Sequence, residues 1–217
     1  GLDINDEIKR TLLNKDLSIS DFNSAIGILK KYSIDFCPFI CVKPPFLTEG
    51  EAIETAKDTI KFVIDSGASH LSLEPVTLQK HTVQDHLNQN NLYRVSYLWT
   101  LVELVRFACD YAKDKDVKIK IGGEFFTPMP YEFAHNCKEC NNRIIELIHK
   151  YNKEQDISIF KDILSLEEVR SKEKSELNCE CQIDWLKAVD EKPEIQLHEL
   201  PTRVKTYLNS CKEYVLK

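Results

Sequence analysis

Four cysteines in two closely spaced pairs constrain this chain more than any other feature. Cys137 and Cys140 form a C-x-x-C pair, and Cys179 and Cys181 form a later C-x-C pair. Thiolates are soft donors, and four of them around one ion favour zinc or an iron–sulfur cluster over magnesium or calcium. The sequence therefore predicts a structural tetrathiolate zinc site, which would pin a charged segment that has little apolar surface of its own to bury.

The sequence leaves alternatives to this site open. The four cysteines can instead form two disulfides or stay as free thiols. His135 precedes the first pair in the string H-N-C-x-x-C, so it can replace a cysteine as a ligand, donate to a ligand sulfur, or lie on the surface. Four thiolates leave no open coordination position, which argues against catalytic zinc.

Composition and charge narrow the class of protein. The chain has 217 residues, of which 42% are apolar, which is typical of one large globular domain or of one domain with an appendage. The formal charge of −6 argues against a broad nucleic-acid-binding surface, which needs clustered Lys and Arg, although a local basic groove stays possible. No long apolar run or signal peptide is visible, so we expect no membrane span. Eight cysteines, half of them in metal-type spacing, favour a reducing cytoplasm.

The first 125 or so residues alternate between strand-like and helix-like patterns. Strands are predicted at 34–42, 70–74 and 117–121. Helices are predicted from a cap at Ser20, from a capping box at Thr48 to about residue 65 before Gly67, and over 98–112. Such alternation with long crossovers predicts parallel strands covered by helices, as in an α/β sheet or an open barrel.

The pattern changes from Thr127 onward, where two prolines precede charged, helix-like segments. We expect a helix over 140–154, a solvated helix or mobile loop over 166–177, and a last helix with Pro201 in its first turn. The sequence therefore predicts two units: residues 1–128 as the α/β part, and residues 129–217 as a small, mainly helical, four-Cys zinc-binding appendage.

Polar residues follow the predicted strands. Lys43 comes after the first strand, Glu74 and Gln79 lie at and after the end of the second, and Glu124 follows the third. Ligands bind at the carboxyl edge of parallel sheets and barrels because the loops converge there. The sequence predicts a ligand site from these residues, with ordinary solvated loops as the alternative reading.

Several strings of this chain, taken in order, resemble the radical S-adenosylmethionine proteins of archaeosine biosynthesis. Those proteins are lyase partners of archaeosine synthase and are more distantly related to the elongator catalytic subunit. The resemblance covers most of residues 1–190, and the four-Cys element is its most specific part. The strings are Gly1–Asp3, Lys43–Phe46, Pro75–Thr82, Tyr93–Trp99, His135–Cys140 and Cys179–Trp185.

The resemblance implies a partial (β/α) barrel of the TIM type, of which this chain supplies the C-terminal half. The family's cluster motif, C-x-x-x-C-x-x-C, is absent, and Cys37 and Cys41 match only its first interval. The resemblance therefore implies that the [4Fe–4S] cluster and S-adenosylmethionine belong to a longer chain with an N-terminal half-barrel. This part alone would be inactive.

Carried over residue by residue, the resemblance puts Asp3 and Lys43 near the cofactor and Glu74, Gln79 and Glu124 on the substrate side of the cavity. The substrate would be a base in tRNA, and a partner enzyme subunit is possible. The alternative function is a non-enzymatic, zinc-stabilised interaction module on a remnant barrel scaffold. A third option is a metal-independent binder of small molecules that uses the polar residues at the strand ends.

Overall fold

The computed structural model describes residues 3, 4, 6, 13, 17–122, 130–177 and 179–215, with the side chains of 174 and 211–215 left aside. Within these residues the chain is an α/β protein with a three-stranded parallel sheet and eight α-helices. The strands are β1 (Phe39–Val42), β2 (His70–Pro75) and β3 (Lys118–Ile121). The α-helices are α2 (Ile19–Lys31), α3 (Glu49–Asp65), α4 (Val83–Gln89), α5 (Leu98–Tyr111), α6 (Lys138–Glu154), α7 (Leu166–Ser171), α8 (Glu180–Asp190) and α9 (Leu200–Val215). Short 3-10 helices lie at η1 (Ile157–Phe160), η2 (Lys174–Glu176) and η3 (Leu197–Glu199).

The strands lie in chain order, β1-β2-β3, and all pairs are parallel. Successive side chains alternate between the two faces of the sheet. One face is apolar and buried; it consists of Ile40, Val42, Leu71, Leu73, Ile119 and Ile121. The other face is mostly polar and, apart from the buried Ser72, more exposed; its register brings together Phe39, Cys41, Ser72, Glu74, Lys118 and Lys120. We call this second set the polar sheet face.

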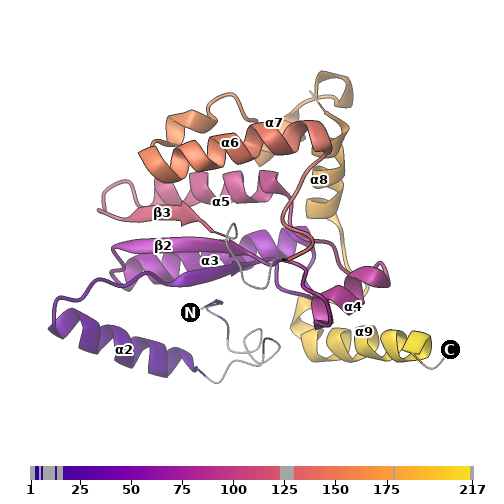
Figure 1. Cartoon of the computed structure of the whole chain (residues 1–217), viewed down its shortest axis with the longest axis horizontal. Coiled ribbons are helices and arrows are strands. Elements are labelled where there is room, and N and C mark those ends of the chain that lie inside the picture. The colour runs from indigo at the N-terminus through magenta and orange to yellow at the C-terminus, as the bar shows by residue number, and fades with distance from the viewer. Residues whose placement is uncertain are drawn as a thin grey trace.

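Helices cover the apolar face. Helix α3 packs on β1 and α5, and α5 packs on β3 and α6. Helix α2 joins this layer through Phe22, whose ring lies 5.9 Å from that of Phe62 in α3. Figure 1 shows the strands one above another in chain order, with α2 beyond the β1 edge and α6 beyond the β3 edge. Helix α3 connects β1 to β2, and α4 and α5 connect β2 to β3, so the chain alternates strand and helix as repeated βα units do.

The two edges of the sheet differ. At the β1 edge, Asp3 forms a parallel bridge with Ile40, donating from its N–H to Phe39 O at 2.9 Å and accepting from Cys41 N at 2.8 Å. At the β3 edge, side chains of α6 replace a neighbouring strand. Asn152 accepts from Ile121 N at 2.9 Å and donates to Ile121 O at 2.7 Å, and Gln155 accepts from Ile119 N at 3.0 Å. The ladder positions of Ile119 and Ile121 are therefore filled.

Most predicted elements are confirmed, with shifted boundaries. The capping box of Thr48 and Glu51 begins α3, and Gly67 follows its end with φ +77°. Helix α2 is capped by Ser18 rather than Ser20, since Ser18 and Asp21 form a capping box. The strand predicted from residue 34 is shorter and begins at Phe39, consistent with Pro38 having no N–H to donate to a ladder.

The charged segment 166–177 forms α7 and η2, and it is anchored because Leu166 and Val169 are buried. Buried side chains of α6 and α8, including Ile148 and Trp185, belong to the same apolar core as the sheet. The core is thus continuous across residue 128, and the division into two units stays a prediction. No helix in the described part of the chain is both long and apolar enough to cross a bilayer.

Helix α9 is fixed by a buried arginine. Arg203 is 1% exposed and forms two bonds to the Glu51 carboxylate, at 2.6 and 2.7 Å, and one to Phe46 O at 2.9 Å. Tyr207 stacks on Phe46, with ring centroids 6.1 Å apart. Burial alone would raise the pKa of Glu51, but the bonds from Arg203 and Thr48 lower it below its usual value. The last helix is therefore tied to the loop after β1.

Candidate metal centre

The four predicted thiols come together at two helix N-termini. Cys137 is the N-cap of α6, and Cys140 lies in its first turn. Cys179 is the N-cap of α8, and Cys181 lies in its first turn. Helix N-termini carry partial positive charge, which stabilises thiolates. Each short spacing therefore positions two sulfurs within one turn, and the fold only has to bring the two turns together.

The sulfur atoms have the spacing of a metal shell. Cys137 Sγ lies 3.4 Å from Cys179 Sγ, and Cys140 Sγ lies 3.6 Å from Cys181 Sγ. All four lie within 4.8 Å of one another. A tetrahedral zinc ion with Zn–S bonds of about 2.3 Å sets its sulfurs about 3.8 Å apart. The four cysteines are free thiols, so the cluster has the geometry and donor chemistry to hold a metal ion such as zinc.

The thiols influence one another's protonation. Burial, followed by hydrogen bonds with Cys137 and Cys181, raises the pKa of Cys140 far above its usual value. Burial is also the largest influence on Cys181, whose pKa is raised to about 11. Burial opposes ionisation of Cys137 too, but the Cys140 N–H and the neighbouring thiols outweigh it and lower the pKa to about 7. A cation would displace the protons of this cluster, since metal ligands bind as thiolates.

Buried polar atoms next to the cluster lack partners. Trp99 Nε1, Asn136 Nδ2 and Gln182 Oε1 are buried without a hydrogen bond. Trp99 and Gln182 line a cavity of about 180 Å³ together with Cys140 and Cys179. The Trp99 indole is nevertheless among the groups that lower the pKa of the Cys181 thiol, so its N–H lies close to that sulfur without the geometry of a full hydrogen bond. The unpaired Trp99 N–H beside Cys181 fits a cluster whose sulfurs become thiolates on metal binding, since a thiolate accepts a stronger hydrogen bond than a thiol.

His135 lies outside the group of metal-type ligands found among the described residues, which consists of the four cysteines. Its Nδ1 is 3.0 Å from Phe133 O and 3.6 Å from the Glu132 carboxylate. Its backbone accepts from Arg94 at 2.8 Å. The imidazole therefore contacts the loop before α6 and is not one of the clustered metal-type ligands.

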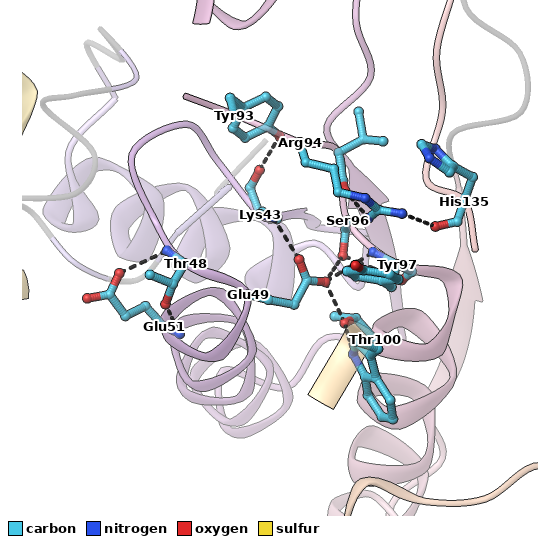
Figure 2. Close-up of polar contacts among 12 residues, drawn as sticks. Lys43, Thr48, Glu49, Glu51, Tyr93, Arg94, Ser96, Tyr97, Thr100 and His135 are labelled. Carbon is cyan, nitrogen blue, oxygen red and sulfur yellow. Dashed lines mark hydrogen bonds and ion pairs between the residues drawn. The ribbon is translucent and has the colours of Figure 1, made fainter. Parts of the chain in front are cut away.

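A second polar cluster lies where β1 ends. Glu49, which is 1% exposed, lies 2.8 Å from Lys43 Nζ through Oε2. Its Oε1 accepts from Ser96 Oγ and Thr100 Oγ1, both at 2.6 Å, and from Tyr97 N at 3.1 Å. Figure 2 shows these donors of α5 and the preceding loop converging on the one carboxylate. Lys43 is thus buried and charge-paired at the end of its strand.

This cluster continues toward α8 and toward a cavity. Trp185 of α8 donates to Thr100 Oγ1 at 2.9 Å. Tyr93 donates to Lys43 O at 2.7 Å, and Lys43 has a left-handed backbone with φ +54°. A cavity of about 430 Å³ lies alongside; Lys43 and Tyr93 line it together with Arg94, whose guanidinium lies 3.5 Å from the ring centre of Tyr97.

The other predicted site residues lie apart from Lys43. Asp3 bridges β1, as described above. Glu74 lies on the polar sheet face, where it accepts from Ser72 Oγ at 2.7 Å, close above Gly122. Gln79 is half-buried and its carbonyl accepts from Thr82 at 2.8 Å. Glu124 lies outside the described residues. The cofactor and substrate roles of these residues stay predictions.

Several residues of these sites are not among those predicted from the sequence. Glu49 is not among the predicted site residues, yet its carboxylate neutralises Lys43. Thr100 is a polar residue in the apolar helix α5, which was an available signal because buried hydroxyls need partners. Trp99 ends one of the strings that carry the resemblance, but nothing near it in the sequence predicts a place beside the sulfurs, which depends on how α5 packs against α6 and α8.

Comparison with known proteins finds three similar curated sequences. The chain is 28% identical to an uncharacterized protein of Methanocaldococcus jannaschii over 184 residues, or 83% of this chain and 45% of that protein. It is 25% identical to archaeosine synthase subunit beta of Methanosarcina acetivorans over 85% of this chain and 48% of that protein. It is 27% identical to archaeosine synthase subunit beta of Thermococcus kodakarensis over 73% of this chain and 48% of that protein.

No protein-family model matches the sequence, and no solved structure matches it. The predicted relation to proteins of archaeosine synthesis is confirmed at the level of sequence similarity. The chain spans about half the length of the curated relatives it matches.

Proposed function

We propose that this chain is the C-terminal part of a radical S-adenosylmethionine enzyme that modifies a tRNA base in archaeosine synthesis. The observation that carries the proposal is the similarity to two proteins named archaeosine synthase subunit beta, which extends over most of this chain and about half of each relative. The word subunit in those names supports a partner enzyme subunit for the whole protein.

The order of the elements supports a half-barrel. Parallel strands in chain order, with helices on one face, are what consecutive βα units of a barrel produce. In a closed barrel the polar sheet face would be the interior. The N-terminal half would then add its strands beyond Asp3, because the β3 edge is already filled by Asn152 and Gln155.

The polar sheet face offers groups for a polar substrate. Glu74 contributes a carboxylate held by the Ser72 hydroxyl at 2.7 Å, and Lys120 contributes an exposed ammonium in the next strand. Lys43, held by Glu49, contributes a fixed positive charge at the strand ends. In this proposal these side chains orient the substrate base. The radical chemistry would come from the [4Fe–4S] cluster and S-adenosylmethionine of the N-terminal half.

The four cysteines have a structural role in this proposal. Four thiolates complete the zinc shell and leave no position for substrate. The ion would join the first turns of α6 and α8, and α8 in turn reaches the Lys43–Glu49 pair through Trp185 and Thr100. Zinc would thus stiffen one wall of the strand-end cavity and take no part in bond breaking.

The test uses the complete protein that contains this chain, purified without oxygen and reconstituted with iron and sulfide. The proposal expects about four iron and four sulfide per chain in a [4Fe–4S] cluster, one zinc, and cleavage of S-adenosylmethionine that depends on precursor tRNA. Cys140→Ser is the matched control and should lose zinc while it keeps iron. A complete protein that binds zinc, but neither iron nor S-adenosylmethionine, would contradict the enzymatic proposal.

The second candidate is a non-enzymatic, zinc-stabilised interaction module. It is favoured by the absence of C-x-x-x-C-x-x-C from this sequence and by the formal charge of −6. The same metal analysis separates the two candidates. A thermal shift with S-adenosylmethionine on this chain tests the third option, a small-molecule binder, because a ligand that binds only the folded state raises the melting temperature.

A further inference from the structure

The indole nitrogen of Trp99 is a buried donor beside the thiol cluster. Trp99 is 6% exposed, and its Nε1 has no hydrogen-bond partner. Trp99 belongs to the first turn of α5, in the α/β part of the chain, whereas the four cysteines belong to α6 and α8. The cavity of about 180 Å³ that Trp99 lines also contains Cys140 and Cys179. The indole is also among the groups that lower the pKa of the Cys181 thiol, so a sulfur atom is an acceptor within reach of its N–H.

The position of Trp99 is fixed from the backbone. Asn136, directly before Cys137, accepts from Trp99 N at 3.4 Å, and its own N–H donates to Asn141 of α6 at 2.6 Å. Asn136 is 6% exposed. Asn136 therefore joins the start of α5 to the segment that carries Cys137 and Cys140. This contact holds the backbone of Trp99 in place relative to that segment.

An unpaired buried N–H is unfavourable, because it has given up its hydrogen bond to water and gained none in the protein. A neutral thiol is a weak acceptor, whereas a thiolate accepts a stronger, charge-assisted bond. A zinc ion with four thiolates carries two net negative charges. The N-termini of α6 and α8 oppose these charges, together with Arg143, which lines the cavity beside Cys140 and Cys179. The orphan donor is therefore explained if the sulfurs beside it are metal-bound.

We infer that Trp99 is a positioning residue of the metal centre, whose indole N–H donates to the metal-bound sulfur of Cys181. This inference rests on the zinc centre of the proposed function. It makes α5 a third helix of the centre, besides the two that supply ligands. The bond stabilises the filled cluster more than the empty one, so it contributes to metal affinity as well as to packing.

The test measures metal binding of the 217-residue chain in Trp99→Phe and in Trp185→Phe. Trp185 is the matched control: it is also buried, with 1% of its surface exposed against 6% for Trp99, but its N–H donates to Thr100 Oγ1. Zinc affinity is measured by competition with a chelator, and the cobalt-substituted protein reports sulfur-to-metal charge transfer. We expect Trp99→Phe to weaken zinc binding about 10- to 100-fold and to move the charge-transfer band to longer wavelength. Trp185→Phe should change neither.

The outcomes separate the inference from its premise. A wild-type chain that binds neither zinc nor cobalt overturns the zinc centre itself. A wild-type chain that binds both, with Trp99→Phe unchanged, overturns only the role of Trp99. Equal weakening in both variants would assign the effect to packing and would also overturn it. If Trp99→Phe does not fold, benzothienylalanine at position 99 keeps the ring shape without the N–H and gives the same comparison.

Discussion

The thiol cluster and the Lys43–Glu49 pair are two polar groups inside the protein that differ in how far their polar atoms find partners within the chain. Glu49 has one oxygen bound by three donors and the other 2.8 Å from Lys43 Nζ, so the charges of the pair cancel within the protein. The thiol cluster has four sulfurs within 4.8 Å of one another and unpaired polar atoms around them.

The difference indicates what each cluster is for. A pair that satisfies itself acts as internal support, and its removal damages the fold. The thiol cluster has unpaired polar atoms around it and thiol protons that a metal ion can displace. We expect a metal ion to complete it. Two experiments test this contrast directly, and two more compare it with other polar contacts of the fold, from the largest expected effect to the smallest.

Loss of one thiol should have the largest effect. We expect Cys140→Ser to lose stoichiometric zinc and, with it, the stabilisation by bound metal, which is about 4 kcal/mol when free zinc is 1,000 times the dissociation constant. Unfolding by denaturant with and without excess zinc measures this. Cys109→Ser is the control, because Cys109 bonds to Tyr151 and lies outside the cluster. Zinc-independent stability of the wild type would remove the contrast.

Breaking the Lys43–Glu49 pair should come next. Glu49→Gln leaves a buried ammonium without its counter-charge, which costs about 3–5 kcal/mol. Glu54→Gln on the same helix is the control, since Glu54 pairs with Lys57 at the surface and should cost less than about 1 kcal/mol. Chemical denaturation of both variants decides it. Similar small losses in both would mean that the buried pair is not internal support.

The filled edge of β3 should matter less. Asn152→Ala removes both partners of the Ile121 peptide groups and should cost about 1–3 kcal/mol. Amide hydrogen exchange at Ile121 should speed up in the variant. Asn142→Ala, at an exposed position of the same helix, provides the comparison. Unchanged exchange at Ile121 would show that the side chain does not replace a strand there.

The smallest effect concerns pH. The pKa of Glu51 is lowered in the folded state, so its bonds with Arg203 and Thr48 stabilise the protein above the unfolded pKa of about 4.3 and this stabilisation is lost as pH falls through the lowered folded value. We expect the difference in stability between wild type and Glu51→Gln to shrink below about pH 4. Urea titrations from pH 7 to pH 3 measure it, and a constant difference would contradict the linkage.

Local spacing explains what could be predicted. Each pair of thiols lies within one helical turn, so the spacings C-x-x-C and C-x-C predict that the two sulfurs of a pair are close together. The start of α3 was also legible, because Thr48 and Glu51 serve each other within one turn. In both cases the partners lie within three residues, and the rest of the fold only has to tolerate them.

The strand-end site was harder to predict, because the direction in which each side chain points is set by the tertiary fold. Lys43 adopts φ +54° and turns to Glu49, while Glu74 lies on the polar sheet face beside Ser72. Both follow strand ends in the sequence, yet alternation along the strand and one left-handed residue separate them. Trp99 reaches the sulfurs through packing of three helices, which no periodicity encodes.

The amide groups of Asn152 and Gln155 have a consequence for how a larger sheet is put together. Because side chains of α6 already bond to the backbone of Ile119 and Ile121, the β3 edge offers few free groups to an added strand. An added strand is therefore expected at the other edge, where Asp3 pairs with β1. Two copies of this chain are therefore not expected to associate by pairing their β3 strands. An incoming half would find a single docking direction, which lowers the number of misassembled products open to it.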